Sequence, residues 1–208
     1  MRNNHGRKAS RISVREASRA IYIDFEGLTN ETPTLCGVQC DGIFEQIVYD
    51  EALASAAENK QLAVLDFEQH IVRLLSKCDD EKRAIVAFSE HELNKICEHV
   101  QIDISHVYRN ANKIAKRWQR ECRPQTKKCK GLKEFLELIG FERRPHLGEK
   151  KSTARIRTVR EQISNNGHYD SISRVAKAKW TKLLEHNKVD CLGMEKLIKI
   201  AAREIGSC

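Results

Sequence analysis

The chain has 208 residues and a net charge of +8, and it contains no apolar run long enough to cross a bilayer. This length suits one substantial domain with its own core better than two. The eight cysteines are scattered and no apolar secretory signal is apparent, so we expect a cytoplasmic protein with reduced thiols and no membrane partner.

The positive charge is concentrated in one part of the chain. Residues 106–160 contain 17 Lys/Arg and 5 Asp/Glu, a net +12 within a chain of +8, so the remainder is mildly acidic. Such a concentration predicts a polyanionic partner, most simply nucleic acid held through its phosphates. The alternative is a well-charged surface without a specific partner.

Residues 1–18 are polar and basic with almost no apolar period, which predicts a flexible arm ahead of a single domain over 19–208.

The first β-strand is expected over about residues 20–25. Successive strand side chains point to opposite faces, so Ile21, Ile23 and Phe25 can face a core. Asp24 and Glu26 then share the other face. Two neighbouring carboxylates repel each other unless a cation or a proton lies between them, and oxygen-rich clusters suit Mg²⁺ or Mn²⁺. The pair therefore predicts half of a metal site, with a solvated acidic strand as the alternative.

Two further strands are expected over 35–40 and 43–49, joined by Asp41-Gly42, a dipeptide typical of hairpins. The apolar period of residues 62–75 predicts a helix, and the short apolar run 84–88 predicts a central parallel strand. Ser89 follows as a candidate N-cap, with Glu92 three residues later in the position of a capping box.

The basic region, about residues 104–168, is predicted to be a largely helical insertion. A helix is expected over 102–118 and a shorter one over 131–139 ending at Gly140, whereas 123–128, 142–160 and 164–167 read as polar segments or loops. The candidate phosphate contacts are Arg117, Arg120, Lys127, Lys128, Arg143, Arg144, Lys150, Lys151 and Arg155. Candidates for base stacking are few, namely Tyr108, Trp118 and Trp180.

Helical periods over 172–184 and 189–202 meet at a junction that contains His186 and Asp190. If the helix is continuous there, these two residues stand at i and i+4 and are neighbours on one face. They could serve the same metal site, or form an ordinary surface pair.

Together, Asp24-x-Glu26, an acid after a parallel strand and His186-x-x-x-Asp190 resemble the DEDDh exonucleases of the ribonuclease H-like superfamily. The stretch from Gly131 to Glu142 is similar to the Leu-Lys…Leu-Gly-Phe signature of predicted ribonuclease H-like nucleases related to the family B polymerase proofreading domain. The stretch from Trp180 to Cys191 resembles that family's Tyr-Asn-x-x-Asp-Val motif, with His186 where Tyr often stands. The resemblance covers about residues 21–200.

This resemblance implies an α/β, ribonuclease H-like mixed sheet of three antiparallel strands followed by parallel strands, flanked by helices. It implies a 3′–5′ exonuclease that cleaves single-stranded or frayed DNA or RNA with two Mg²⁺ or Mn²⁺ ions. Asp24, Glu26 and Asp190 match metal ligands, and His186 matches the general base, a role for which a group that titrates near neutral pH is suited.

The second motif departs from the usual exonuclease pattern, which has Asn, then an aromatic residue followed by Asp. An aromatic-Glu pair in the related nucleases favours Glu92 as the fourth ligand, and Glu90 and Asp103 are its competitors.

Three other functions stay open on the sequence alone. The chain could be a non-catalytic nucleic-acid-binding module with this fold, or a ribonuclease H-like endonuclease in which the histidine only assists. A zinc module built from Cys122, Cys129 and His146 would have a spacing that matches no standard pattern.

Overall fold

The computed structural model describes residues 10–142 and 151–207. Its centre is a six-stranded sheet with the order β4-β3-β2-β1-β5-β6. The strands are β1 (Ile21–Glu26), β2 (Leu35–Cys40), β3 (Ile43–Val48), β4 (Ala63–Val64), β5 (Ile85–Ala87) and β6 (Tyr108–Asn110). β1 pairs antiparallel with β2 and parallel with β5, so the sheet changes direction at this strand. The predicted α/β architecture with antiparallel and then parallel strands is confirmed.

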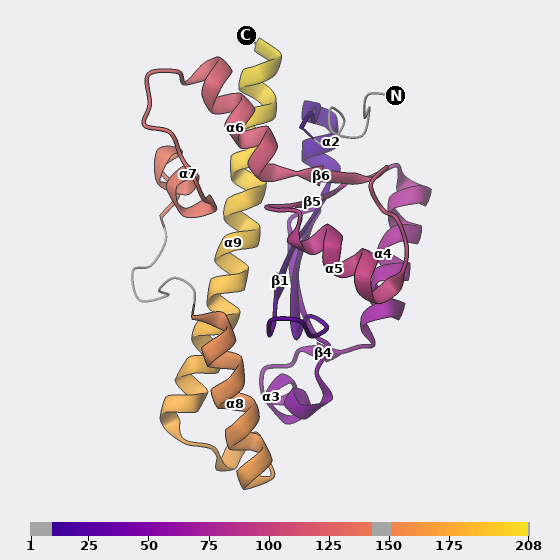
Figure 1. The fold of residues 1–208 in the computed structure, drawn as a ribbon, viewed down its shortest axis with the longest axis vertical. Helices are drawn as coiled ribbons and strands as arrows, with labels where there is room; N and C mark the ends of the chain where they lie inside the picture. The colour runs from indigo at the N-terminus through magenta and orange to yellow at the C-terminus, as the bar shows by residue number, and fades with distance from the viewer. Residues whose placement is uncertain (1–9, 143–150, 208) are drawn as a thin grey trace.

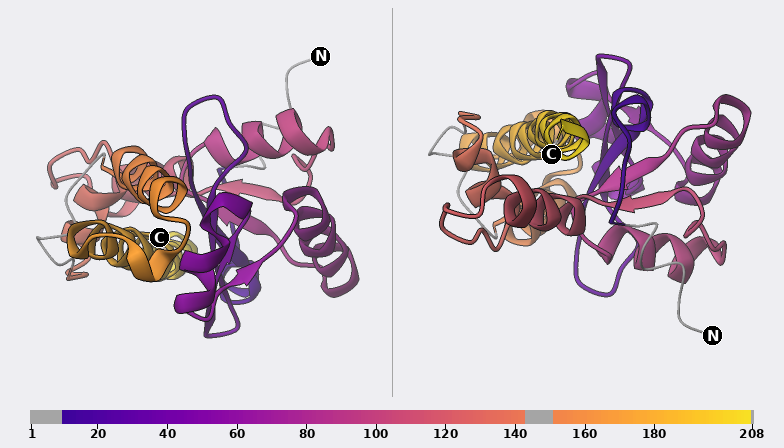
Figure 2. Two further views of the ribbon diagram at one scale, coloured as in Figure 1. Left: turned by 90° about the horizontal axis from the view of Figure 1, so that it is seen from below. Right: turned by 90° about the horizontal axis from the view of Figure 1, so that it is seen from above.

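Helices cover both faces of the sheet, which gives three layers (Figures 1 and 2). The helices are α2 (Val14–Arg19), η1 (Glu51–Leu53), α3 (Ala54–Asn59), α4 (Phe67–Glu81), α5 (His91–Val100), α6 (Ala111–Cys122), α7 (Leu132–Leu138), α8 (Ser152–Asn166), η3 (Tyr169–Ser171) and α9 (Arg174–Ser207). α4 and α5 pack on one face, and α9 packs on the other with α2, α6, α7 and α8 around it. Within the described ranges no helix has the length and apolarity that a membrane crossing requires.

The alternation predicted for β1 is confirmed. Ile21, Ile23 and Phe25 are buried in the cluster that α4 and α5 complete. Tyr22 is buried on the opposite face, in a cluster with residues of α9. Because side chains alternate along a strand, Asp24 and Glu26 lie on the α9 side of the sheet.

The hairpin prediction is also confirmed. β2 and β3 pair antiparallel with Cys40 opposite Ile43. The two turn residues, Asp41 (φ 51°) and Gly42 (φ 81°), both have positive φ, as a type I′ turn requires. At the end of α7, Gly140 adopts the expected left-handed conformation (φ 65°).

The predicted flexible arm is wrong at its C-terminal end, because residues 14–19 form α2. Ser13 caps this helix: its hydroxyl accepts from the Glu16 backbone N–H at 3.1 Å, and Glu16 Oε2 accepts from the Ser13 N–H at 3.1 Å. This reciprocal capping box is a local signal that the basic composition obscured. Residues 1–9 of the arm lie outside the described residues.

The helix expected over 102–118 is wrong in its first half. Residues 108–110 form β6, which pairs parallel with β5, and α6 begins only after Asn110, whose side chain accepts from Lys113 N at 2.9 Å. The β6 residue Arg109 is buried, with a guanidinium nitrogen 2.9 Å from Glu16 Oε1. The ion pair with Glu16, which is distant in the sequence, therefore compensates the burial of Arg109 in this polar strand.

Two other boundaries differ from expectation. The helix predicted over 62–75 begins at Phe67, because the Asp66 side chain caps it by accepting from Gln69 N at 2.9 Å. Residues read as polar segments at 152–160 and as a loop at 164–167 form α8 and its end. Ile156, Val159 and other apolar residues of this helix pack against α9 and α3.

Candidate metal and catalytic site

Both β1 carboxylates contact α9. Asn187 of α9 donates from Nδ2 to the backbone oxygen and to Oδ2 of Asp24, each at 2.9 Å. Glu26 Oε1 lies 3.8 Å from Nε2 of His186. The acidic face of β1 is thus covered by the C-terminal helix.

The C-terminal helix runs unbroken through the predicted junction, so His186 and Asp190 share one face as expected for i and i+4. His186 Nε2 lies 3.7 Å from Asp190 Oδ2, close to its distance from Glu26. All three side chains are largely buried, with exposed fractions of 12%, 16% and 13% for His186, Asp190 and Glu26. One imidazole therefore lies between a carboxylate of β1 and a carboxylate of α9.

Glu92 reaches the same place from the start of α5. The Ser89 hydroxyl accepts from His91 N at 3.1 Å and donates to Glu92 Oε2 at 3.2 Å, so it serves both the helix end and the carboxylate. Glu92 is only 5% exposed. Its charge raises the pKa of both Asp24 and Glu26, which means that the three carboxylates are electrostatic neighbours.

The two competitors for the fourth acidic position are engaged elsewhere. Glu90 is half exposed and forms an ion pair with Lys113 of α6. Asp103 is exposed and accepts from the backbone N–H and the hydroxyl of Ser105, at 2.8 and 3.1 Å. The structure therefore brings Glu92, rather than these two carboxylates, into the buried acidic group.

The acidic group is electrostatically unfavourable as it stands. Burial is the largest cause of the raised pKa of Asp24, which lies well above its ordinary 3.8, and the three neighbouring carboxylates raise it further. Burial also raises the pKa of Glu26 to about 7 and that of Glu92 to about 7, while hydrogen bonds from Ser152 and Ser89, respectively, oppose these shifts. Such a group favours the uptake of a proton or a cation.

The start of α8 forms a further part of the site that the sequence did not reveal. The Ser152 hydroxyl hydrogen-bonds to Glu26, and the charge of Arg155 lowers the pKa of Glu26. Arg155, a candidate phosphate contact, is 5% exposed and lies beside the acidic group. Thr153 Oγ1 donates to the Gly27 backbone oxygen at 3.2 Å and holds α8 against the end of β1.

The donor set suits Mg²⁺ or Mn²⁺, because both ions prefer carboxylate oxygens. In the part of the chain that the structure describes, no three His, Cys, Asp or Glu side chains are arranged so that they could hold one ion without moving. Asp24, Glu26, Glu92 and Asp190 are nevertheless close enough for their charges to raise the pKa of Asp24 and Glu26.

The predicted phosphate contacts are dispersed. Arg117 and Arg120 both form ion pairs with Glu121, at 2.9 and 3.0 Å. Lys151 is exposed at the start of α8. Arg143, Arg144 and Lys150 lie outside the described residues.

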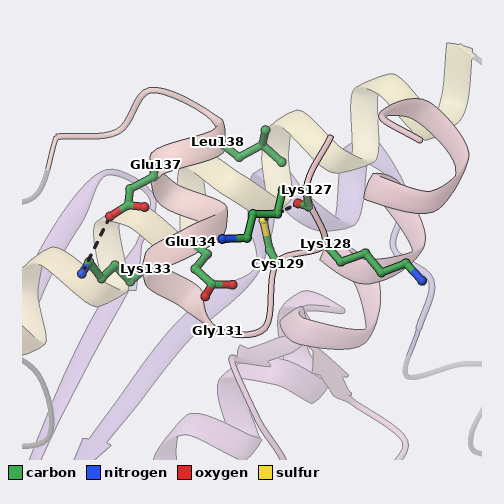
Figure 3. A pocket seen from close by; sticks show the side chains of 8 residues that line it. All are labelled: Lys127, Lys128, Cys129, Gly131, Lys133, Glu134, Glu137 and Leu138. Carbon is green, nitrogen blue, oxygen red and sulfur yellow. Dashed lines mark hydrogen bonds and ion pairs between the residues drawn. The ribbon is translucent and has the colours of Figure 1, made fainter. Parts of the chain in front are cut away.

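Lys127 and Lys128 are exposed and line a pocket between the α6–α7 connection and α7 (Figure 3). Glu134 and Glu137 line the same pocket, and Lys133 lies 3.9 Å from Glu137. Figure 3 shows Lys128 pointing away from α7. These two lysines, Lys151 and Arg120, whose side chain is 71% exposed beside Glu121, are the described candidates that offer positive charge at the surface.

The structure also bears on the residues considered for base stacking and for a zinc site. The aromatic residues considered for base stacking, Tyr108, Trp118 and Trp180, are each at most 2% exposed and belong to the core, so that expectation is wrong. Cys122 and Cys129 are partly buried against the apolar cluster between α6 and α9, and His146 lies outside the described residues. The zinc alternative stays without support in the described part of the chain.

Three residues of the site have contacts that the sequence did not predict. Asn187 hydrogen-bonds to Asp24, Ser152 hydrogen-bonds to Glu26, and the charge of Arg155 acts on Glu26. Asn187 belongs to the stretch that resembles Tyr-Asn-x-x-Asp-Val, but nothing local indicated that it would contact Asp24. Ser152 and Arg155 lie in a segment without an apolar signal strong enough to predict a helix. No protein-family model, curated protein or solved structure matches the chain, so its function has to follow from the chemistry of these residues.

Proposed function

We propose that this protein is a metal-dependent nuclease that hydrolyses phosphodiester bonds, acting as a 3′–5′ exonuclease on single-stranded or frayed ends of DNA or RNA. One observation carries the proposal. Carboxylates from β1, α5 and α9 meet at a single, largely buried place, and a histidine lies between two of them. The mixed sheet, with the acidic strand where it changes direction, is compatible with a ribonuclease H-like fold.

Asp24, Glu26, Glu92 and Asp190 are the residues that would hold two divalent ions, Mg²⁺ or Mn²⁺. Bound there, the ions would supply a water activated for attack and stabilisation of the leaving oxygen. Their charge would also compensate the burial that raises the pKa of Asp24, Glu26 and Glu92, and the repulsion from neighbouring carboxylates that raises the pKa of Asp24 and Glu26 further.

His186 is the candidate general base. Its Nε2 faces the acidic group, and an exposed fraction of 12% leaves the ring in contact with solvent. Glu26 and Asp190 flank this nitrogen at 3.8 and 3.7 Å, so the ring lies beside carboxylates that would hold the ions. In that position it would accept a proton from the attacking water.

A non-catalytic nucleic-acid-binding module is the second candidate. The observation that favours it is the lack, among the described residues, of three ligating side chains already arranged around one point. In that case the basic surface would bind nucleic acid, and the acidic group would remain protonated in part.

The test uses 5′-labelled single strands of DNA and RNA, incubated with Mn²⁺ or Mg²⁺ and with a chelator as a control. We expect a ladder that shortens from the 3′ end, lost with the chelator and lost in Asp24→Asn. Glu92→Gln should lose activity as well. Glu90→Gln is its matched control, because Glu90 is a nearby carboxylate at the surface and should retain activity.

A circular single strand separates the remaining outcomes, because it offers no end to an exonuclease. Cleavage of the circle would support the endonuclease instead. Retention of both substrates on the protein without any cleavage would support the binding module and contradict the proposal.

A further inference from the structure

Asn187 connects the helix of the candidate site to two strands of the sheet. It is fully buried in the middle of α9. Its Nδ2 group donates to Asp24 O and Asp24 Oδ2, each at 2.9 Å, and its Oδ1 accepts from Gln46 Nε2 of β3 at 2.9 Å. Gln46 Nε2 also donates to the Leu184 backbone oxygen at 3.0 Å, one turn earlier in the helix.

The hydrogen bond from Gln46 fixes the orientation of the Asn187 side-chain amide. An amide has a donor end and an acceptor end, and a donor from Gln46 occupies the acceptor end. The NH₂ end must therefore face Asp24, where one hydrogen goes to the backbone oxygen and the other to the carboxylate. If the amide were flipped, Asn187 Oδ1 would face the backbone oxygen and Oδ2 of Asp24, and no hydrogen would lie between these oxygens.

The close approach depends on a glycine. Gly37 of β2 pairs opposite Asp24, and a Cβ at this position would overlap Oδ1 of Asn187 and lie 2.9 Å from its Cγ. Only the absence of a side chain at Gly37 gives Asn187 the space to reach β1. The contact is thus a feature of three secondary-structure elements and not of α9 alone.

The hydrogen bond from Asn187 to the Asp24 backbone oxygen would be enough to hold α9 against β1. The second bond, to Oδ2, restricts the rotation of the carboxylate and leaves its other oxygen to the acidic group. Because His186 and Asp190 are on the same helix, this bond fixes the Asp24 carboxylate relative to both of them. Groups that orient a ligand in this way strengthen metal binding without touching the ion.

We propose that Asn187 is a positioning residue that orients the Asp24 carboxylate for the proposed nuclease reaction, with Gln46 setting the direction of its amide. The inference rests on the proposed function, since it assigns Asp24 to a metal site. It makes the ligand geometry dependent on a hydrogen-bond chain that begins on β3, at the far side of the hairpin.

The test is a calorimetric titration of the full chain with Mn²⁺ alone, at a temperature far below unfolding. Asn187→Ala should bind Mn²⁺ about 10- to 100-fold more weakly than the wild type. Gln46→Glu should also weaken Mn²⁺ binding, because a carboxylate cannot donate to Oδ1 and the Asn187 amide would turn. Gln46→Glu is nearly isosteric, so it keeps the test valid if Asn187→Ala fails to fold.

Leu136→Ala is the control for a merely structural role. Leu136 is buried in α7 and packs against Gly193 of α9, so its truncation should lower the unfolding temperature but leave Mn²⁺ affinity unchanged. Wild-type Mn²⁺ affinity in both Asn187→Ala and Gln46→Glu would overturn the positioning role while leaving the nuclease proposal intact. A wild-type protein that neither binds Mn²⁺ nor cleaves nucleic acid would overturn the proposed function, and this inference with it.

Discussion

Four carboxylates share one region of this protein, and burial opposes the ionisation of three of them, Asp24, Glu26 and Glu92, by raising their pKa. The pKa of Glu26 and that of Glu92 are both about 7, above the ordinary value of 4.5, and burial is the main cause. A group whose pKa is raised by folding stabilises the folded state at low pH, and this contribution is lost as the pH rises through the folded pKa. Without metal, these two residues therefore destabilise the protein progressively between about pH 5 and pH 8.

Divalent metal should reverse that trend. Metal binding requires the ionised carboxylates, so affinity rises as the pH rises through 7. We expect Mn²⁺ to raise the unfolding temperature strongly at pH 8 and hardly at pH 5.5. At a concentration 100-fold above Kd the gain is about 2.7 kcal/mol. Thermal unfolding with and without Mn²⁺ at both pH values measures this, and an equal shift at the two would contradict the assignment of these carboxylates as ligands.

His186→Gln separates catalysis from metal binding. Glutamine keeps the approximate size of the side chain but cannot take up the proton of the attacking water. The turnover number should fall by about 10²- to 10⁴-fold, while Mn²⁺ affinity stays close to that of the wild type. Calorimetry and single-turnover cleavage provide the two measurements.

His91→Gln is the matched control, because His91 is an exposed histidine next to Glu92 and has no role in the proposed reaction. Its turnover should equal that of the wild type. Unchanged turnover in His186→Gln would remove His186 from the role of base.

At the scale of elements, the site depends on how closely α9 packs on β1 and β2. A Cβ at Gly37 would lie 2.9 Å from Asn187 Cγ and 2.8 Å from Cys191 Sγ, both of them in a fully buried part of the helix. The helix would have to move outward, and it carries two of the site residues with it. The hairpin is therefore as important to the site as the acidic strand.

Gly37→Ala should accordingly lower the free energy of unfolding by about 1–3 kcal/mol, the usual cost of overpacking a core, and should reduce nuclease activity beyond that loss. Gly206→Ala is the comparison: it lies in the last turn of α9 with open space around it, and alanine favours the helix. Urea unfolding and cleavage assays measure both effects. Full activity in a folded Gly37→Ala protein would show that the close packing has no bearing on the site.

Several elements were predictable because their signals are local. The alternation in β1, the Asp41-Gly42 turn and the helical period around His186 each depend on residues a few positions apart, and the structure confirms all three. β6 and α8 were not predictable in this way. Tyr108–Asn110 forms a strand because β5 lies beside it and Glu16 pairs with its arginine, and neither partner is near in sequence.

Across the molecule, the described basic residues of the insertion are divided between internal pairs and a smaller exposed set. Arg109 and Arg155 are buried, and Arg123 pairs with Glu204 at 2.6 Å. Lys127 and Lys128 remain exposed beside α7 (Figure 3). The net charge of the segment therefore overstates the charge that a partner would meet.

The double variant Lys127→Ser, Lys128→Ser tests this surface. Each phosphate bound on a single strand contributes about 0.7 to the slope of log K against log salt concentration, so the slope should decrease by that amount for each phosphate that the variant no longer binds. Lys60→Ser serves as the control, since Lys60 is an exposed lysine at the end of α3. Binding of labelled single strands over a range of salt measures the slope, and an unchanged slope would exclude these two lysines from the binding surface.

The local periods, the hairpin turn, the acidic pair and the i, i+4 spacing of His186 and Asp190 could all be predicted from the chain, because each depends on residues that are close together in it. That Glu92 rather than Glu90 or Asp103 joins the acidic group, and that Asn187 and Ser152 contact it, follows only from the packing of the helices on the sheet. The physical reason is that burial and charge interactions depend on distances in space. Residues more than 160 positions apart, such as Asp24 and Asn187, come together only when α9 packs on β1.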